Sequence, residues 1–379
     1  MTSHESPFEI AVPDSDLADL ADRLSRTRWP ELETVSDWSQ GVPLTYLRNL
    51  CEYWSTEYEW REREAGLNRF DQFRTTIDGL GIHFVHVRSP VPDACPLVIT
   101  HGWPGSFVEF LAVIGPLTDP GAFGGDPADA FHVVCPSLPG YAFSDKPTSS
   151  GWGVDRIARA WAQLMTDLGY NRYGAQGGDW GSAVTSRLGF LDAAHVVGIH
   201  LNMLSVGTDS GSEDLTQAEI AALEAMKYYS EWDSGYAKEQ STRPQTIGYS
   251  LVDSPVGLCA WILEKFWSWT DTDGDPVGAL GADRILDNVM LYWLTGSGAS
   301  AARLYWEAFG GRLAGKIKVP TGVSIYPKEI FRPSRRWAER RYPNIVHWEE
   351  LPRGGHFAAF EQPDLFVDQL RKFFRVVRE

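Results

Sequence analysis

The sequence has few cysteines, an excess of acidic over basic residues, and no long apolar run. Its four cysteines, Cys51, Cys95, Cys135 and Cys259, form no CxxC pair and lie in apolar sequence, which predicts reduced thiols in a core. The 34 Lys and Arg residues against 50 Asp and Glu residues give a formal net charge of −16. Because that charge repels a phosphate backbone, we expect no nucleic acid as a partner.

Targeting signals and metal-binding patterns are also missing. A membrane-spanning helix needs about 18 consecutive apolar residues, and no stretch supplies them. The acidic N-terminus, MTSHESPFEIAVPDSD, does not have the basic and then apolar pattern of a signal peptide. We therefore expect a cytoplasmic protein without a membrane anchor. The closest histidine pair, His83 and His86, alternates across a predicted strand, so a shared metal ion is not expected.

The sequence does show the alternation of strand and helix patterns that is typical of an α/β fold. Short apolar runs alternate with helical patterns such as VDRIARAWAQLMTDLG, which is typical of a mostly parallel sheet. A turn signal at Asp78-Gly79 predicts a hairpin before these runs. The expected strands of the sheet lie in PLVITHGWP, FHVVCPSLPG, YGAQGG, VVGIHLN, VPTGVSIYP and NIVHWEELP.

The same patterns divide the chain into four segments. Residues 1–72 are helical in pattern and form either a cover or an interface, of which a cover is favoured. Residues 73–203 and 309–379 form the α/β core, and residues 204–308 form a helical insertion. The insertion follows a strand end at Asn202, which places it as a cap over the ligand site of an open sheet. Its tryptophans suggest an apolar cavity; they are Trp232, Trp261, Trp267, Trp269 and Trp293.

The stretch GGDWG, Gly177 to Gly181, has the form of a nucleophile elbow with aspartate at its centre. Small residues two before and two after Asp179 are what a strained strand-to-helix turn requires. Aspartate is also a preferred residue at a helix N-cap, so the motif alone leaves a purely structural role open.

The loop HGWPGS, His101 to Ser106, follows a predicted strand where esterases of this fold place an oxyanion loop. The backbone N–H groups of Trp103 and Trp180 are the expected oxyanion donors. We also expect the Trp103-Pro104 peptide bond to be cis.

The expected general base is His356, because the base comes last in the chain order nucleophile, acid, histidine. The acid is expected in the loop after VPTGVSIYP, where Glu329 is the carboxylate at hand. The other position used in this fold, after the preceding strand, holds Asn202. Glu329 would fix the tautomer of His356 and stabilise its cation. A buried structural histidine and a solvated loop glutamate are the alternatives.

An aspartate nucleophile restricts the chemistry. An ordinary aspartate, with a pKa of about 3.9, is ionised at pH 7 and needs no base for its attack. Attack on a saturated carbon gives an alkyl ester, which a histidine-activated water can hydrolyse. The group displaced from carbon is then an epoxide oxygen or a halide.

At this point the chain resembles the microsomal-type epoxide hydrolases, α/β-hydrolases with an N-terminal extension, which include juvenile hormone epoxide hydrolases. The resemblance covers nearly the whole chain and rests on HGWPGS, PGYAFSDKP, GGDWGS, DSPVGLCAWILEKF, NVMLYW and RGGHFAAFEQP. It implies a cofactor-independent hydrolase without a metal, whose partners are water and an apolar or aromatic epoxide that becomes a vicinal diol. A homodimer is compatible with it.

The resemblance also implies the site residues. Asp179 matches the nucleophile, Glu329 the charge partner and His356 the base. Tyr305 and Tyr236 match the tyrosine pair that protonates the epoxide oxygen. The same irregular region of the cap also holds Tyr228, Tyr229 and Tyr249.

Two other functions use the same fold. A haloalkane dehalogenase would share Asp179 and His356 and would hold its halide with N–H donors, for which the indoles of Trp103 and Trp180 are candidates. A non-catalytic binding protein is the second alternative, because a fold alone does not give a function.

Overall fold

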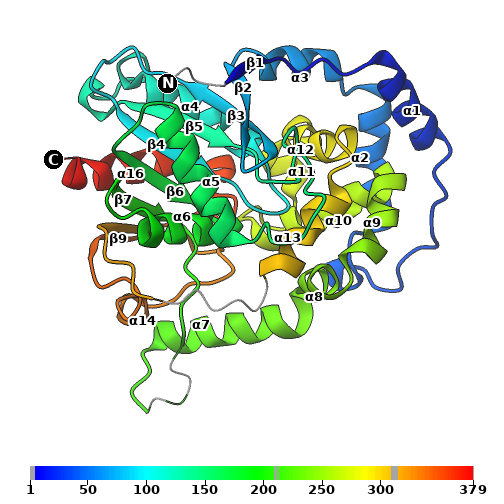
Figure 1. The fold of residues 1–379 in the computed structure, drawn as a ribbon. Coiled ribbons are helices and arrows are strands. Elements are labelled where there is room, and N and C mark those ends of the chain that lie inside the picture. The colour runs from blue at the N-terminus through cyan, green and yellow to red at the C-terminus, as the bar shows by residue number, and fades with distance from the viewer. Residues whose placement is uncertain (1–4, 209–210, 212, 309–314, 379) are drawn as a thin grey trace.

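One nine-stranded sheet forms the centre of the protein (Figure 1). The computed structural model describes residues 5–208, 211, 213–308 and 315–378. The strands lie in the order β1-β2-β3-β5-β4-β6-β7-β8-β9, with antiparallel pairing as far as β5 and parallel pairing beyond it. This arrangement confirms the expected α/β fold with its mostly parallel sheet. The strands are β1 (Ser6–Phe8), β2 (Gln72–Ile77), β3 (Leu80–Val87), β4 (Cys95–Thr100), β5 (Phe131–Pro136), β6 (Tyr173–Gly177), β7 (Val196–Leu201), β8 (Thr321–Ile325) and β9 (Ile345–Glu350).

Helices cover both faces of this sheet, so the central strands β6 and β8 are buried along their whole length. On β6, a Cβ at Gly174 would lie 2.2 Å from the ring of Phe374, and a Cβ at Gly177 would lie 2.2 Å from the carbonyl oxygen of Gly181. Residues three apart on a strand face opposite sides, so α16 (Pro363–Val377) and α6 (Asp179–Leu191) cover opposite faces. The helix α4 (Leu111–Thr118) packs beside α16, and α5 (Val154–Asp167) packs beside α6.

The cap is helical and follows β7, as expected. A π-helical turn, Tyr229–Asp233, continues α7. The cap helices are α7 (Gln217–Tyr228), α8 (Gly235–Thr242), α9 (Pro244–Asp253), α10 (Pro255–Trp269), α11 (Pro276–Leu280), α12 (Ala282–Leu294) and α13 (Gly298–Ala308). Short helices α14 (Arg335–Ala338) and α15 (Ala358–Glu361) flank β9, and 3-10 turns occupy Trp38–Gln40, Phe107–Phe110, Pro120–Phe123 and Pro127–Asp129.

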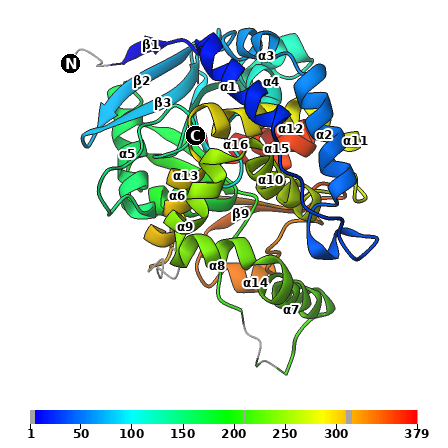
Figure 2. The ribbon, with the colours of Figure 1, turned by 90° about the vertical axis from the view of Figure 1, so that its right-hand side faces the viewer.

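The N-terminal segment extends the sheet and also packs on the cap. Its strand β1 pairs antiparallel with β2. The helices α1 (Asp14–Ser25), α2 (Leu44–Thr56) and α3 (Trp60–Leu67) follow, and α1 and α2 lie against α10 and α12 (Figure 2). The sequence did not predict β1, because three residues are too few to show an alternating pattern. The division of the chain at residues 72, 203 and 308 stays a prediction.

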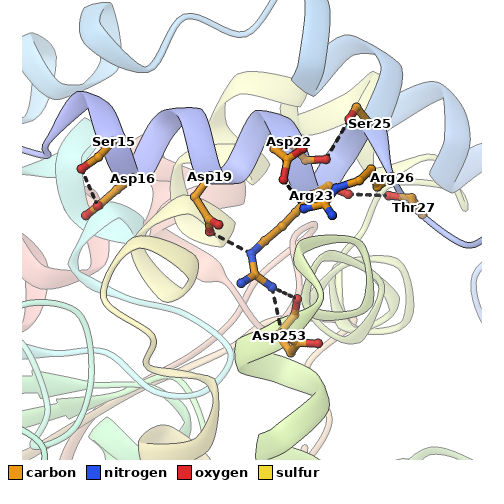
Figure 3. Close-up of polar contacts among 9 residues, drawn as sticks. All are labelled: Ser15, Asp16, Asp19, Asp22, Arg23, Ser25, Arg26, Thr27 and Asp253. Atoms are coloured by element: carbon orange, nitrogen blue, oxygen red, sulfur yellow. Dashed lines mark hydrogen bonds and ion pairs between the residues drawn. The ribbon is translucent and has the colours of Figure 1, made fainter.

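Polar contacts join the N-terminal helices to the cap. The guanidinium of Arg23 on α1 donates to Oδ1 of Asp253 at 2.9 Å and to its carbonyl oxygen at 2.7 Å (Figure 3). Asp19 holds the same guanidinium at 2.8 Å. Further along, the Tyr46 hydroxyl donates to Asp275 at 2.6 Å.

Helix α12 has contacts on two sides. Its Asp287 is buried and accepts hydrogen bonds from Tyr58 at 2.9 Å and from Arg63 at 2.8 and 2.5 Å. The next residue, Asn288, donates to the Pro104 carbonyl oxygen at 2.7 Å and accepts from the Ser106 hydroxyl at 2.7 Å. One helix therefore joins the N-terminal segment to the HGWPGS loop.

We expect Asp287→Ala to lower the free energy of unfolding by about 3 kcal/mol, because it leaves a guanidinium and a phenol without their buried acceptor. Urea denaturation measures the change. Asp253→Ala is the matched control: its pair with Arg23 is exposed, so its loss is expected to cost less than about 1 kcal/mol. Equal effects of the two substitutions would contradict this account of the cluster.

Among the described residues, no single helix combines the length and the apolar composition that crossing a membrane requires; α9 and α10 reach both only as a pair bent by 116°. In the same residues, His, Cys, Asp and Glu side chains form no group of three that could hold a metal ion. The four cysteines are free thiols, and all but Cys95 are buried.

Candidate active site

Asp179 lies at the sharp turn between β6 and α6. Its φ of 48° is in the left-handed region, which a residue with a side chain occupies only when its surroundings require it. The flanking glycines make the turn sterically accessible: a Cβ at Gly177 would lie 2.2 Å from the Gly181 carbonyl oxygen, and a Cβ at Gly181 would lie 1.9 Å from that of Thr100. The strand-to-helix turn expected at this aspartate is confirmed.

The HGWPGS loop after β4 approaches the Asp179 carboxylate. The backbone N–H of Trp103 donates to Oδ1 of Asp179 at 2.8 Å. Gly102 allows this approach, because a Cβ there would lie 2.3 Å from Cβ of Asp179. The Trp103-Pro104 bond is cis, as expected. The other expected donor, the Trp180 N–H, belongs to the first turn of α6, where amides have no acceptor within the helix.

His356 lies between two carboxylates. Its Nδ1 is 2.7 Å from Oε1 of Glu329, and its Nε2 is 3.5 Å from Oδ2 of Asp179. Oε1 of Glu329 also accepts the Ile330 N–H at 2.7 Å, which fixes the carboxylate in the loop after β8. The structure thus brings together the three residues that the sequence predicted as nucleophile, base and acid.

The two carboxylates control the charge of His356. Burial lowers the pKa of this imidazole, but Glu329 and Asp179 together outweigh burial and raise it well above its ordinary value. Both carboxylates therefore favour the imidazolium form of His356 in the free protein.

Backbone contacts fix the position of His356. Its N–H donates to the carbonyl oxygen of Trp269 on the cap at 2.8 Å. The chain reaches this contact through Gly354, which has a φ of 101°, and Gly355, where a Cβ would lie 2.3 Å from the same carbonyl oxygen. Both glycines before the histidine are thus required by geometry.

Two cap tyrosines meet at the indole of Trp103. The ring of Tyr236 stacks on it at 4.7 Å between centroids, and the ring of Tyr305 meets it edge-on at 5.8 Å. The two phenol rings are 5.7 Å apart. Burial is the main reason why the pKa of each phenol lies well above its ordinary value, so both hydroxyls stay protonated and can donate.

Of Tyr228, Tyr229 and Tyr249, only Tyr229 reaches this site. Its hydroxyl lies 2.9 Å from that of Tyr236. Tyr228 and Tyr249 are 59% and 68% exposed. Tyr305, Tyr236 and Tyr229 thus line the cleft together with Asp179, and the assignment of Tyr305 and Tyr236 as the proton-donating pair stays a prediction.

The cap tryptophans do not line the site as a group. Trp269 is buried, with its ring 5.0 Å from that of His356. Trp232 is 76% exposed, and Trp267 stacks on Trp38 at 4.9 Å. None of the five tryptophans is among the described residues that line the cleft at Asp179, so the apolar part of its lining comes from other side chains, such as Met203, Ile330 and Phe331.

Two separate spaces meet at Asp179. A cleft of about 920 Å³ leads from it, and its lining combines apolar and tyrosine side chains with charged side chains such as Arg156 and Arg159. On the other side lies a small cavity bounded by buried residues that include His356. Among the described lining residues, Asp179 is common to both spaces and no other residue is.

Sequence reasoning missed two ionisable groups at the site. Glu109, in the turn after HGWPGS, lines the small cavity. The buried ammonium of Lys265 lies 4.5 Å from the ring centroid of Tyr236 and 3.0 Å from Oδ1 of Asp233. Both residues lie in ordinary helical sequence, and only the packing of distant segments shows their position.

Comparisons with known proteins agree with this geometry. Residues 5–110 match the family model "Epoxide hydrolase N terminus", and residues 96–245 match "alpha/beta hydrolase fold". A protein of Stigmatella aurantiaca (strain DW4/3-1) is 56% identical over 98% of this chain and 85% of its own length. Epoxide hydrolase 1 of Sus scrofa is 38% identical over 98% of this chain and 89% of its own length. The chain belongs to the epoxide hydrolase family.

A solved structure agrees with this assignment of the epoxide hydrolase. The crystal structure of juvenile hormone epoxide hydrolase from the silkworm Bombyx mori superposes with a TM-score of 0.92 at 32% identity, over 99% of this chain and 95% of that one. The likeness therefore includes the N-terminal extension and the cap as well as the core. This likeness to an epoxide hydrolase gives no support to the dehalogenase or to the non-catalytic alternative.

Proposed function

We propose that this epoxide hydrolase converts an apolar or aromatic epoxide to a vicinal diol through a covalent ester at Asp179. The observation that carries the proposal is the position of one carboxylate. Oδ1 of Asp179 accepts the Trp103 N–H, and Oδ2 faces His356. Asp179 also lines the cleft, together with Tyr236 and Tyr305.

In the first step, Asp179 attacks an epoxide carbon from the cleft. The carbon–oxygen bond of the ring breaks, and the released oxygen takes a proton from Tyr305 or Tyr236. In water an alkoxide is a much stronger base than a phenolate, whose parent phenol has a pKa of about 10; burial raises the basicity of both oxyanions, so the transfer stays favourable. The products are an ester at Asp179, an alcohol and one tyrosinate.

Ester formation itself then turns His356 into a base. The ester carries no charge, so one of the two carboxylates that raise the pKa of His356 is lost. The imidazolium proton passes to the tyrosinate through water, which restores the phenol and leaves a neutral imidazole. Glu329 keeps the tautomer in which Nε2 is free to accept a proton.

In the second step, neutral His356 takes a proton from a water that attacks Cγ of Asp179. The charge that develops on Oδ1 is stabilised by the N–H groups of Trp103 and Trp180. Collapse of this intermediate breaks the bond between Cγ and the ester oxygen, and the imidazolium protonates the departing oxygen. The aspartic acid that remains returns its proton to His356, so one water and one epoxide give one diol.

The cleft suggests the substrate class. Its lining includes Met203, Tyr229, Ile330 and Phe331 in addition to the two tyrosines of the site, and we call this part of the lining the apolar end. An apolar substituent that fills this end gains about 0.8 kcal/mol for each CH₂ group removed from water.

A panel of epoxides tests the proposed function. We expect diol formation from styrene oxide and from long-chain terminal epoxides, with a kcat/KM at least about tenfold above that for glycidol, because glycidol buries little apolar surface. Halide release from bromoalkanes is measured in parallel. Halide release without diol formation would overturn the proposal and favour a dehalogenase.

We expect Tyr305→Phe and Tyr236→Phe each to slow ester formation about a hundredfold, the usual effect of removing one donor to a developing oxyanion. Ester hydrolysis is expected to change less, because it depends on His356 and Glu329. Rapid-quench measurement of the covalent ester separates the two rates.

Tyr228→Phe is the matched control for the tyrosine variants, because it removes the same hydroxyl from an exposed position on the neighbouring cap helix. It is expected to leave both rates unchanged. Normal ester formation in both site variants would exclude the tyrosines as acids, and a loss at Tyr305 alone would transfer the second role to Tyr229. Cytoplasmic location and homodimer formation stay predictions.

A further inference from the structure

The small cavity behind Asp179 has the size and the lining of a site for one water molecule. The centre of a water molecule can move through about 20 Å³ of it, and roughly 10–15 Å³ is enough to hold one water. Its polar lining groups include His356, Asn202 and Glu109, and Asp179 separates it from the cleft. A water here would meet the base and the ester carbonyl carbon without displacing the substrate.

Glu109 is the residue of this cavity to which the mechanism gives no role. Its carboxyl lies against Gly105 of the oxyanion loop, where a Cβ would lie 1.5 Å from Oε1. A glycine at position 105 is therefore required for the carboxyl to lie where it does. Glu109 is partly buried and is one of the residues that line the cavity.

We propose that Glu109 is a positioning residue, which holds the hydrolytic water in this cavity together with Asn202. The inference rests on the proposed covalent mechanism. A water that attacks carbon uses one lone pair for the attack and one hydrogen for the base, so it has one hydrogen and one lone pair left. Glu109 accepts the remaining hydrogen. Asn202 supplies the donor, because its Oδ1 is already taken by Gln176 at 2.8 Å.

The charge state of Glu109 makes this role dependent on pH. Burial raises the pKa of its carboxyl to about 8, while His356 lowers it and Asp179 raises it. His101 of the oxyanion loop and Tyr292 of α12 face the same group; both are neutral at pH 7, since burial lowers the pKa of His101 to about 4 and raises that of Tyr292. When the ester forms, His356 and Asp179 lose their charges and no longer shift the pKa of Glu109. Burial then remains as the main cause of the raised pKa.

A neutral Glu109 is the active form. Below pH 8 the carboxyl is protonated and adds no charge beside the ester. Above pH 8 it becomes a carboxylate, which opposes the negative charge that develops on the tetrahedral intermediate. Ester hydrolysis is therefore expected to slow by about tenfold between pH 7 and pH 9.5, while ester formation does not show this decline.

Two variants test the role, with rapid-quench measurement of ester formation and decay on styrene oxide. Glu109→Leu removes both polar oxygens, so we expect ester decay about a hundredfold slower, accumulation of the ester, and ester formation within about threefold of the parent. Glu109→Gln keeps the acceptor without an ionisable proton. We expect it to hydrolyse the ester at a rate within about threefold of the parent at pH 7 and to lose the decline above pH 8.

Glu361→Gln is the matched control. Glu361 is also a buried glutamate with a raised pKa, about 7, but its oxygens accept the N–H groups of Asp271 and Phe357, and among the described residues it does not line the cavity. It is expected to keep the decline above pH 8.

Three results would overturn the assignment of Glu109: unchanged ester decay in Glu109→Leu, a decline above pH 8 that persists in Glu109→Gln, or its loss in Glu361→Gln. If Glu109→Leu does not fold, Glu109→Gln alone decides through its pH profile. The absence of any covalent ester in the parent enzyme would instead refute the proposed function, which is a distinguishable outcome.

Discussion

Asp179→Asn is expected to reduce diol formation by at least about 10⁴-fold, the scale of loss seen when a covalent nucleophile is removed from a hydrolase. An amide of the same size has no negative charge with which to attack the epoxide carbon. Asparagine also tolerates the left-handed backbone conformation of residue 179, so the turn itself is expected to remain intact.

Oxygen-18 water gives the direct test of the same step in the parent enzyme. In a single turnover the new oxygen of the diol is expected to come from Asp179, so the diol is unlabelled and the label enters the carboxylate. A labelled first-turnover diol would mean direct attack by water.

Asp273→Asn is the control for Asp179→Asn, because Asp273 is exposed and has a similar φ of 49°.

His356→Gln is expected to stop the reaction at the ester. We expect turnover to fall by about 10³-fold, because the glutamine amide cannot take the proton from water as Nε2 of His356 does. Ester formation is expected to continue, since the attack by Asp179 needs no base. Mass spectrometry of the intact protein should therefore show an adduct with the mass of one epoxide, which decays slowly.

The control for this variant is His195→Gln. His195 is exposed and pairs with Asp192 on the surface, so its loss is expected to leave both steps unchanged. If His356→Gln formed no adduct and still showed normal expression and stability, His356 would be needed for the first step. That result would contradict the switch from imidazolium to base described above.

The sequence was most informative where a function depends on local geometry. The turn at Asp179 requires small residues at fixed positions, and the loop at Trp103 follows a strand directly, so both were predictable from short motifs. The loop with His356 also follows a predicted strand, and its two glycines are explained by the positive φ of Gly354 and by the close approach of Gly355 to the carbonyl oxygen of Trp269. In each case one short segment contains the information.

The sequence was least informative where distant segments meet. Glu109 lines the small cavity because β4, α6 and the loop before α15 converge, and none of those contacts is visible in its own sequence context. The packing partners of the cap tryptophans could not be predicted for a similar reason. An aromatic residue in a helix packs equally well against a core, an extension or a substrate, and Trp267 packs against Trp38 of the extension.

Helix α12 has a consequence for exchanging parts between relatives. On one side Asp287 binds Tyr58 and Arg63 of the extension, and on the other Asn288 binds the loop that carries Trp103. Two contacts thus connect the extension to the loop of Trp103, whose N–H is the proposed donor to the tetrahedral intermediate. A chimera that takes its first 67 residues from another member of the family therefore has to take the matching α12 as well. Without it, we expect the HGWPGS loop to shift, and a change in substrate preference could then not be assigned to the extension itself.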